Sequence, residues 1–278
     1  MNHPEFNLPP HYQHFLDRVI AACQSDEHVI ALFLTGSYAR GSPDAYSDLD
    51  FILIIKPDAY QDFIAGKKDF IRQLGEPLSL EDFEYPSALL CTFTDGVEID
   101  LGIHSPEQVD QLDSAPYRVL LDKQGLFPKA VFTPTRLPPD DQVETLRRLI
   151  FWFWHDLSHF IKAFGRGQLW FAQGELEILR GYCINLARLR HDFTTLVSLD
   201  EPYFKLENVL PVEILMPLQA TFCPLEPEAV LRSARTILHF YQELARPLAR
   251  EHGLEYPERL ERILVAHLEK ISTRDESF

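Results

Sequence analysis

The sequence predicts an α+β protein in which an N-terminal mixed-sheet domain is followed by a C-terminal helical bundle. Short apolar segments bounded by turn residues are confined to the first half of the chain, and beyond about residue 140 only helical periodicity remains. An irregular stretch with several prolines, from Lys123 to Asp140, separates the two patterns. Because 278 residues suffice for two modest domains, we expect one at residues 1–135 and the other at 136–278.

The first half alternates helices with buried strands. Apolar residues at helical spacing predict a helix over 11–23, and the segment VIALFLT at 29–35 has the length and composition of a buried strand. A polar, turn-rich segment follows, and DLDFILII at 48–55 predicts a second strand. Helical spacing returns over 58–74, and a glycine and a proline end that helix.

A hairpin and one more strand complete the predicted sheet. The segments SALLCTFT and VEIDLGI are joined by Asp95-Gly96, a turn pair in which both residues tolerate positive φ. Ser105 and Gln108 have the spacing of a capping box at the start of a short helix. YRVLLD at 117–122 is the last segment with a strand pattern. The remainder predicts helices only, over 140–164, 168–192, 226–251 and 257–271.

The net charge of −16 bears on the partners of the chain. A protein that binds nucleic acid usually carries a basic patch, so DNA and RNA are not expected partners, whereas a cationic small molecule would be attracted. No apolar segment is long enough to span a bilayer and the N-terminal residues lack a signal pattern, so we expect a cytoplasmic monomer or homodimer without membrane contact.

The cysteines are scattered without a CxxC pair, which argues against a zinc cluster or a disulfide framework: Cys23, Cys91, Cys183 and Cys223.

The loop between the first two strands carries the candidate chemistry. Gly36-Ser37 is followed after ten residues by Asp48 and Asp50, which strand periodicity places on one face. Glycine permits close approach of the backbone to a phosphate, serine offers a hydroxyl and an amide, and Arg40 adds positive charge. The two carboxylates are suitable ligands for magnesium.

A third carboxylate comes from the hairpin. Glu98 and Asp100 share the polar face of VEIDLGI, opposite its apolar residues. Three acids on neighbouring strands form a typical metal site for phosphoryl-type transfer, in which metal ions neutralise the charge of the transition state.

This combination resembles the polymerase-β-like nucleotidyltransferase superfamily, and within it the aminoglycoside (streptomycin adenylyltransferase-like) and lincosamide nucleotidyltransferases. Gly-Ser, ten residues and DLD carry the resemblance, with DGVEIDLGI similar to the family's hairpin and LLDKQG to its last strand. Further weak similarity covers FIKAF and GLEYPERLERILVAHLEKI, and so extends over most of the chain. The resemblance implies a nucleotidyltransferase domain followed by a helical substrate-binding domain.

The resemblance also implies roles for individual residues, with Mg²⁺ as the metal and ATP as the nucleotide donor. Asp48 and Asp50 correspond to the magnesium ligands, and Asp100 to a third acid that is either a ligand or the base that deprotonates the acceptor. The implied triphosphate-binding residues are Gly36, Ser37, Ser47 and Lys162.

Some relatives use as base a glutamate one helical turn before the lysine, and this chain has Ser158 there. Asp100 is therefore the first choice for the base, with Glu98 and Glu175 in reserve. The segment from His155 to His159 superficially resembles a zinc-binding HExxH helix. Because its glutamate is absent, we favour histidines that line a cleft or make structural hydrogen bonds.

The implied reaction is magnesium-dependent transfer of AMP from ATP to a hydroxyl of an aminoglycoside-like antibiotic. Three alternatives stay open: AMP transfer to a protein, as in antitoxin-like relatives, transfer to a lincosamide, and a relative that binds nucleotide without turnover. The long helical second half favours a small-molecule acceptor, because antitoxin-like relatives resemble the first half alone.

Overall fold

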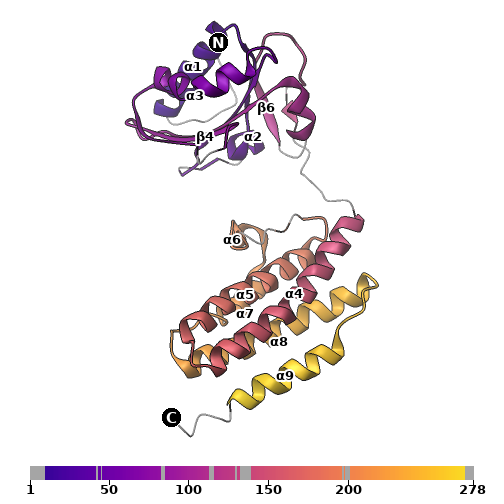
Figure 1. The fold of residues 1–278 in the computed structure, drawn as a ribbon. Coiled ribbons are helices and arrows are strands. Elements are labelled where there is room, and N and C mark those ends of the chain that lie inside the picture. Colours follow the sequence, from indigo (N-terminus) through magenta and orange to yellow (C-terminus); the bar gives the residue numbers. More distant parts are fainter. Residues whose placement is uncertain are drawn as a thin grey trace. The chain divides into compact units, whose positions relative to one another are not determined.

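The structure is a computed structural model and describes residues 10–41, 43–44, 46–82, 85–112, 116–128, 130–131, 139–195, 197 and 201–272 (Figure 1). Contacts between Cα atoms divide the chain into two compact units, Met1–Thr135 and Arg136–Phe278. The class is α+β, as predicted, with the strands in the first unit and only helices among the described elements of the second.

Among its described residues, the first unit is built around a seven-stranded mixed sheet of order β3-β4-β5-β2-β1-β6-β7. The pair β2–β5 is parallel and the other pairs are antiparallel. Its elements in chain order are α1 (Pro10–Ser25), β1 (Val29–Leu34), α2 (Gly36–Arg40), β2 (Leu49–Ile55), α3 (Tyr60–Leu74), β3 (Pro77–Glu81), β4 (Ala88–Phe93), β5 (Glu98–His104), the 3-10 helix η1 (Pro106–Leu112), β6 (Tyr117–Asp122) and β7 (Ala130–Val131).

The two faces of this sheet differ. Helices α1 and α3 cover one face (Figure 1), where Phe15 and Ile71 belong to the same apolar cluster as Phe51 and Leu101. The opposite face carries a smaller cluster around Phe33, Ile54 and Tyr117. Because side chains alternate along a strand, the residues between the apolar positions of β2 and β5 project from the less covered face.

The predicted hairpin is confirmed. Gly96 has φ +81° and its N–H donates to the Phe93 carbonyl at 2.9 Å, so the turn uses the conformation that glycine permits. The capping box is also present, since the Ser105 N–H donates to Gln108 Oε1 at 2.9 Å. Strands β3 and β7 were not predicted. β3 begins with a proline and is mostly solvent-exposed, so its sequence lacks the apolar alternation of an inner strand.

The second unit is helical. Its elements are α4 (Pro139–Gly165), α5 (Leu169–His191), α6 (Leu206–Val209), α7 (Val212–Gln219), α8 (Pro227–Glu251) and α9 (Glu258–Ser272). The four long helices match those predicted, whereas α6 and α7 were missed because they are too short to show a period. Aromatic side chains fill the core: the rings of Phe153 and Tyr241 stack at 3.6 Å, and the Tyr241 hydroxyl donates to the Ile150 carbonyl at 3.0 Å. No described helix combines the length and hydropathy that crossing a membrane requires.

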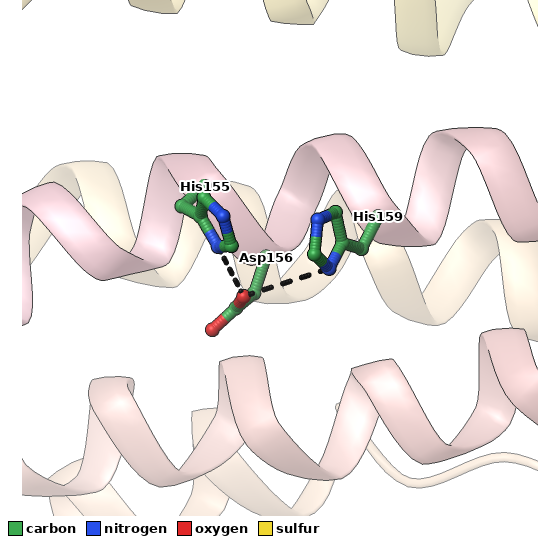
Figure 2. A group of neighbouring side chains, drawn as sticks. All are labelled: His155, Asp156 and His159. Carbon is green, nitrogen blue, oxygen red and sulfur yellow. Dashed lines mark hydrogen bonds and ion pairs between the residues drawn. The ribbon is translucent and has the colours of Figure 1, made fainter.

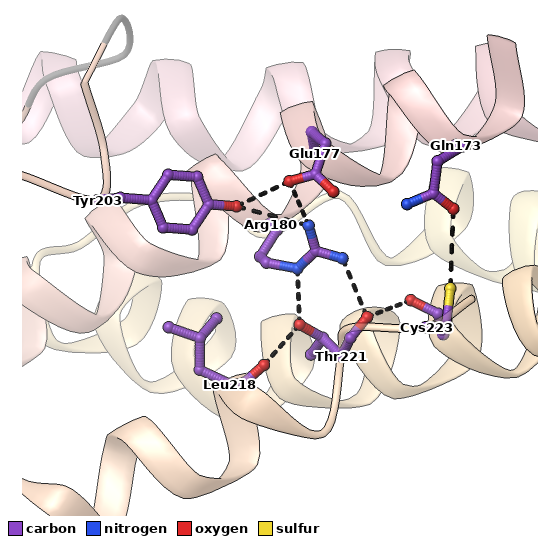
Figure 3. Close-up of polar contacts among 8 residues, drawn as sticks. Gln173, Glu177, Arg180, Tyr203, Leu218, Thr221 and Cys223 are labelled. Carbon is purple, nitrogen blue, oxygen red and sulfur yellow. Dashed lines mark hydrogen bonds and ion pairs between the residues drawn. The ribbon is translucent and has the colours of Figure 1, made fainter. Parts of the chain in front are cut away.

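A fully buried arginine fastens the segment after α7 to α5 (Figure 3). Arg180 Nε donates to Thr221 Oγ1 at 2.7 Å and Arg180 Nη2 to the Thr221 carbonyl at 3.0 Å. Arg180 Nη1 lies 2.5 Å from the half-exposed Glu177 carboxylate, and the guanidinium lies 4.0 Å from the centre of the Phe222 ring. The charge is therefore buried with its donors satisfied.

Candidate active site

Three inner strands of the first unit, β1, β2 and β5, bring the candidate residues to the same end of the sheet. β1 ends where its antiparallel neighbour β2 begins, and the Thr35 N–H donates to the Asp50 carbonyl at 2.8 Å. β5 runs parallel to β2 and pairs Asp100 with Asp50. Neighbouring strands lie about 4.8 Å apart, so two side chains on the same face in register are close enough to share a ligand. The strand order thus places the two carboxylates side by side.

Asp48 precedes β2, which begins at Leu49, one residue later than predicted. Asp48 and Asp100 are exposed and Asp50 is partly buried. Although the Asp100 side chain reaches solvent, partial burial of its carboxyl raises its pKa, and the negative charge of Asp48 raises it further. Asp48 and Asp100 therefore repel each other. Oxygen ligands with excess negative charge are the donor set that a hard divalent cation such as Mg²⁺ requires.

Gly36 lies directly against one of these carboxylates. Its φ is +61°, and a Cβ atom added there would lie 1.6 Å from Asp50 Oδ2, far inside van der Waals contact. Only glycine fits this position, both for its backbone conformation and for the space that Asp50 occupies. The sequence predicted that Gly36 lets the backbone approach a phosphate, and it gave no sign that the Asp50 carboxylate lies against this glycine.

Ser37, Ser47 and Arg40 differ in their surroundings. The Ser37 hydroxyl is buried and has no hydrogen-bond partner among the described residues, although buried polar groups nearly always have one. Ser47 Oγ accepts from the Asp44 N–H at 2.9 Å and thereby shapes the loop before β2. Arg40 ends α2 with its side chain exposed.

One residue beside the site was missed by sequence reasoning. Arg118 on β6 donates from Nε to the Ala39 carbonyl at 3.1 Å and so fastens α2 to the sheet. The sequence predicts the strand that carries Arg118. It does not predict that β6 pairs with β1, and this pairing brings Arg118 close to α2. That pairing joins segments far apart in the chain and leaves no local signal.

The remaining candidates are Glu98, Lys162 and Glu175. Glu98 is exposed at the start of β5, on the same face of the strand as Asp100. Lys162 belongs to the second unit, where it is exposed on α4 with Nζ 3.5 Å from Ser158 Oγ. Glu175 is buried on α5, and its pKa is raised by burial and by the charge of Asp156. The structure thus brings together the Gly-Ser turn and the three aspartates.

Comparison with solved structures gives remote similarities. An aminoglycoside 6-adenyltransferase from Bacillus subtilis is 15% identical, with a TM-score of 0.45 and coverage of 94% of this chain and 98% of that one. A spectinomycin adenyltransferase from Enterococcus faecialis is 12% identical, with a TM-score of 0.26 and coverage of 94% and 99%. A CCA-adding enzyme is 13% identical, with a TM-score of 0.34 and coverage of 97% and 93%. No curated protein matches significantly.

Comparison with protein families is more informative. The family model described as streptomycin adenylyltransferase matches residues 11–271, which include the Gly-Ser turn, the three aspartates and most of the helical unit. The resemblance inferred from the motifs is therefore confirmed over nearly the whole chain. The chain belongs to the streptomycin adenylyltransferase family and is an adenylyltransferase.

Proposed function

We propose that the chain transfers AMP from ATP to a hydroxyl group of a cationic, aminoglycoside-like antibiotic in the cytoplasm. The observation that carries the chemistry is the pairing of Asp50 with Asp100 on parallel strands, beside the buried and unpartnered hydroxyl of Ser37. Nucleotidyl transfer requires carboxylates that bind a metal and a hydrogen-bond donor that binds a phosphate, and both lie at the same end of this sheet.

Asp48, Asp50 and Asp100 would hold Mg²⁺, and the mutual repulsion of Asp48 and Asp100 supports a cation there. When bound, the metal neutralises charge on the triphosphate as pyrophosphate leaves. The phosphates themselves would be held by Gly36, Ser37, Arg40, Ser47 and Lys162. The orphaned Ser37 hydroxyl supports this assignment most directly, since a phosphate oxygen would accept its hydrogen bond.

Asp100 is our candidate for the base that removes the proton from the acceptor hydroxyl. Its raised pKa makes its carboxylate a stronger proton acceptor than an ordinary aspartate. Asp100→Asn separates this role from that of a metal ligand. Loss of a base lowers kcat and leaves the affinity for magnesium-ATP unchanged, whereas loss of a ligand weakens that affinity.

The acceptor is inferred from the family and from charge. A net charge of −16 attracts amino and guanidino groups, and the helical domain at 136–278 would supply carboxylates that orient the acceptor toward the nucleotidyltransferase domain at 1–135. Oriented binding would place one hydroxyl in line with the α-phosphate.

An acceptor screen tests the proposal. The chain is incubated with magnesium, each nucleoside triphosphate in turn, and streptomycin, spectinomycin, kanamycin or lincomycin, and products are identified by mass. We expect one AMP group on an aminoglycoside, release of pyrophosphate, and no product with Asp48→Asn or Asp50→Asn. Modified lincomycin alone supports the lincosamide alternative. A labelled polypeptide supports protein modification, and nucleotide binding without any product supports the non-catalytic alternative.

A further inference from the structure

Two histidines and an aspartate gather on α4 of the second unit (Figure 2). His155 Nδ1 lies 2.7 Å from Asp156 Oδ1, and His159 Nδ1 lies 4.0 Å from the same oxygen. One potential ligand atom from each residue lies within 4.8 Å of the other two. Figure 2 shows one ring nitrogen of each histidine facing the Asp156 carboxylate that lies between the two rings.

The helix and its neighbour set this geometry. His155 and His159 are four residues apart and therefore lie one above the other on the same face of α4. Asp156 is held from the other side, because the Tyr182 hydroxyl of α5 donates to Asp156 Oδ2 at 2.7 Å. The side chain of Asp156 is only 13% exposed, whereas those of the histidines are 41% and 40% exposed. The cluster therefore has a fixed base and an edge open to solvent.

A second acid lies close to this base. Glu175 on α5 is 3% exposed, lies within electrostatic range of Asp156 and His155, and its Oε2 has no hydrogen-bond partner among the described residues. No lysine or arginine forms an ion pair with Asp156 or Glu175 in the described parts of the chain. The basic groups that Asp156 does contact are the two imidazoles, so a cation bound by them would also offset the charge of its carboxylate.

We propose that His155, Asp156 and His159 on α4 bind a divalent transition-metal ion of the zinc type, with none of the aspartates of the first unit among its ligands. Two imidazole nitrogens and one carboxylate oxygen are ligands that suit zinc, whereas magnesium prefers oxygen ligands alone. Three protein ligands leave a fourth position for water or another donor at the solvent-exposed edge. The sequence alone favoured histidines that line a cleft or make structural hydrogen bonds, since the zinc-helix glutamate is absent; the structure adds Asp156 as a candidate third ligand.

The test uses the untagged full chain, freed of metal and kept in excess magnesium so that the aspartate site is saturated. Zn²⁺ is titrated by calorimetry, and Co²⁺ by its visible absorption, which distinguishes a four-coordinate site from a six-coordinate, oxygen-ligated one. We expect one ion per chain that magnesium does not displace. The double change His155→Ala and His159→Ala should weaken binding at least about tenfold. The matched control is His239→Ala on α8, which removes a histidine that faces Glu243 at 3.2 Å, also four residues away, and should leave the affinity unchanged.

Three results overturn the proposal: no zinc binding in excess magnesium, equal affinity in the double variant, or loss of zinc binding in Asp48→Asn. Because the double variant could fail to fold, a second readout uses the unaltered chain. Zinc should shift the imidazole resonances of His155 and His159 and leave that of His239 in place. Shifts spread evenly over the histidines, or absent from these two, contradict the site.

Discussion

Because glycine has no side chain, Gly36 leaves the space that the Asp50 carboxylate occupies. Gly36→Ala would place a methyl group 1.6 Å from Asp50 Oδ2 and would also strain a backbone with φ +61°. We expect turnover to fall about a hundredfold, because a shift of about 1 Å in a catalytic group has that effect. The matched control is Gly96→Ala, which carries similar backbone strain at φ +81° but meets no atom within 4 Å. It should lower the melting temperature slightly and keep the activity; equal activity in both variants would contradict the role of Gly36.

Asp100 illustrates a conflict between activity and stability. Its pKa is raised in the folded chain, so the folded state binds this proton more tightly than the unfolded state does. The free energy of unfolding therefore falls as pH rises from the unfolded pKa, about 3.9, through the folded pKa, and the full penalty remains at neutral pH.

Asp100→Asn should therefore raise the free energy of unfolding at neutral pH in the absence of metal. The gain should vanish below about pH 3, where the aspartic acid of the unaltered chain is protonated and residue 100 is uncharged in both proteins. Urea titrations at several pH values measure this effect, and the same variant should lose transferase activity. Asp95→Asn is the control, because it removes the ion pair that Asp95 forms with Arg18 at 2.8 Å and should not stabilise the chain. A stabilisation that persists at low pH would show another cause.

Among the secondary-structure elements, those with a clear local sequence pattern were predicted from the sequence. The turn at Asp95-Gly96 and the buried segments that became β1 and β2 carry clear signals, since glycine conformation and apolar runs are local properties. The expected adjacency of β2 and β5 is confirmed, but their parallel direction and register were not predictable from local pattern, because the pairing joins residues fifty positions apart. The motif therefore predicted one site for Asp50 and Asp100, and the register shows that the two residues are direct neighbours.

The link between α5 and the segment after α7 gives a prediction about Arg180. Arg180→Met keeps much of the volume but removes the donors to Thr221, so we expect a loss of about 2–4 kcal/mol in the free energy of unfolding. Early proteolytic cleavage near residues 201–223 should accompany it. The matched control, Arg232→Met, removes an exposed arginine paired with Glu228 at 3.5 Å and should change stability little. Equal effects of the two changes would mean that burial of Arg180 is unimportant.

For the whole molecule, the charge of −16 predicts how the reaction responds to salt. Attraction between exposed charges is screened over about 10 Å at 0.1 M ionic strength. The KM for a cationic aminoglycoside should therefore rise severalfold between about 0.01 and about 0.3 M salt, with kcat nearly constant. The KM for magnesium-ATP, measured in the same series, is the internal control and should not rise, because this complex is an anion that the same charge repels. A salt-independent KM for the aminoglycoside would argue against recognition by carboxylates.

The strand order also has a consequence for the growing chain during synthesis. β1 and β2 are synthesised before their outer neighbours in the sheet, which are β6 beside β1 and β5 beside β2. Until then the apolar segments VIALFL and LDFILII present unpaired backbone along both edges of a two-stranded ribbon. Nascent chains that stop before residue 98 carry both edges bare and would associate with one another or engage chaperones. Completion of β5 thus does two things at once: it covers one of these edges and assembles the aspartate pair.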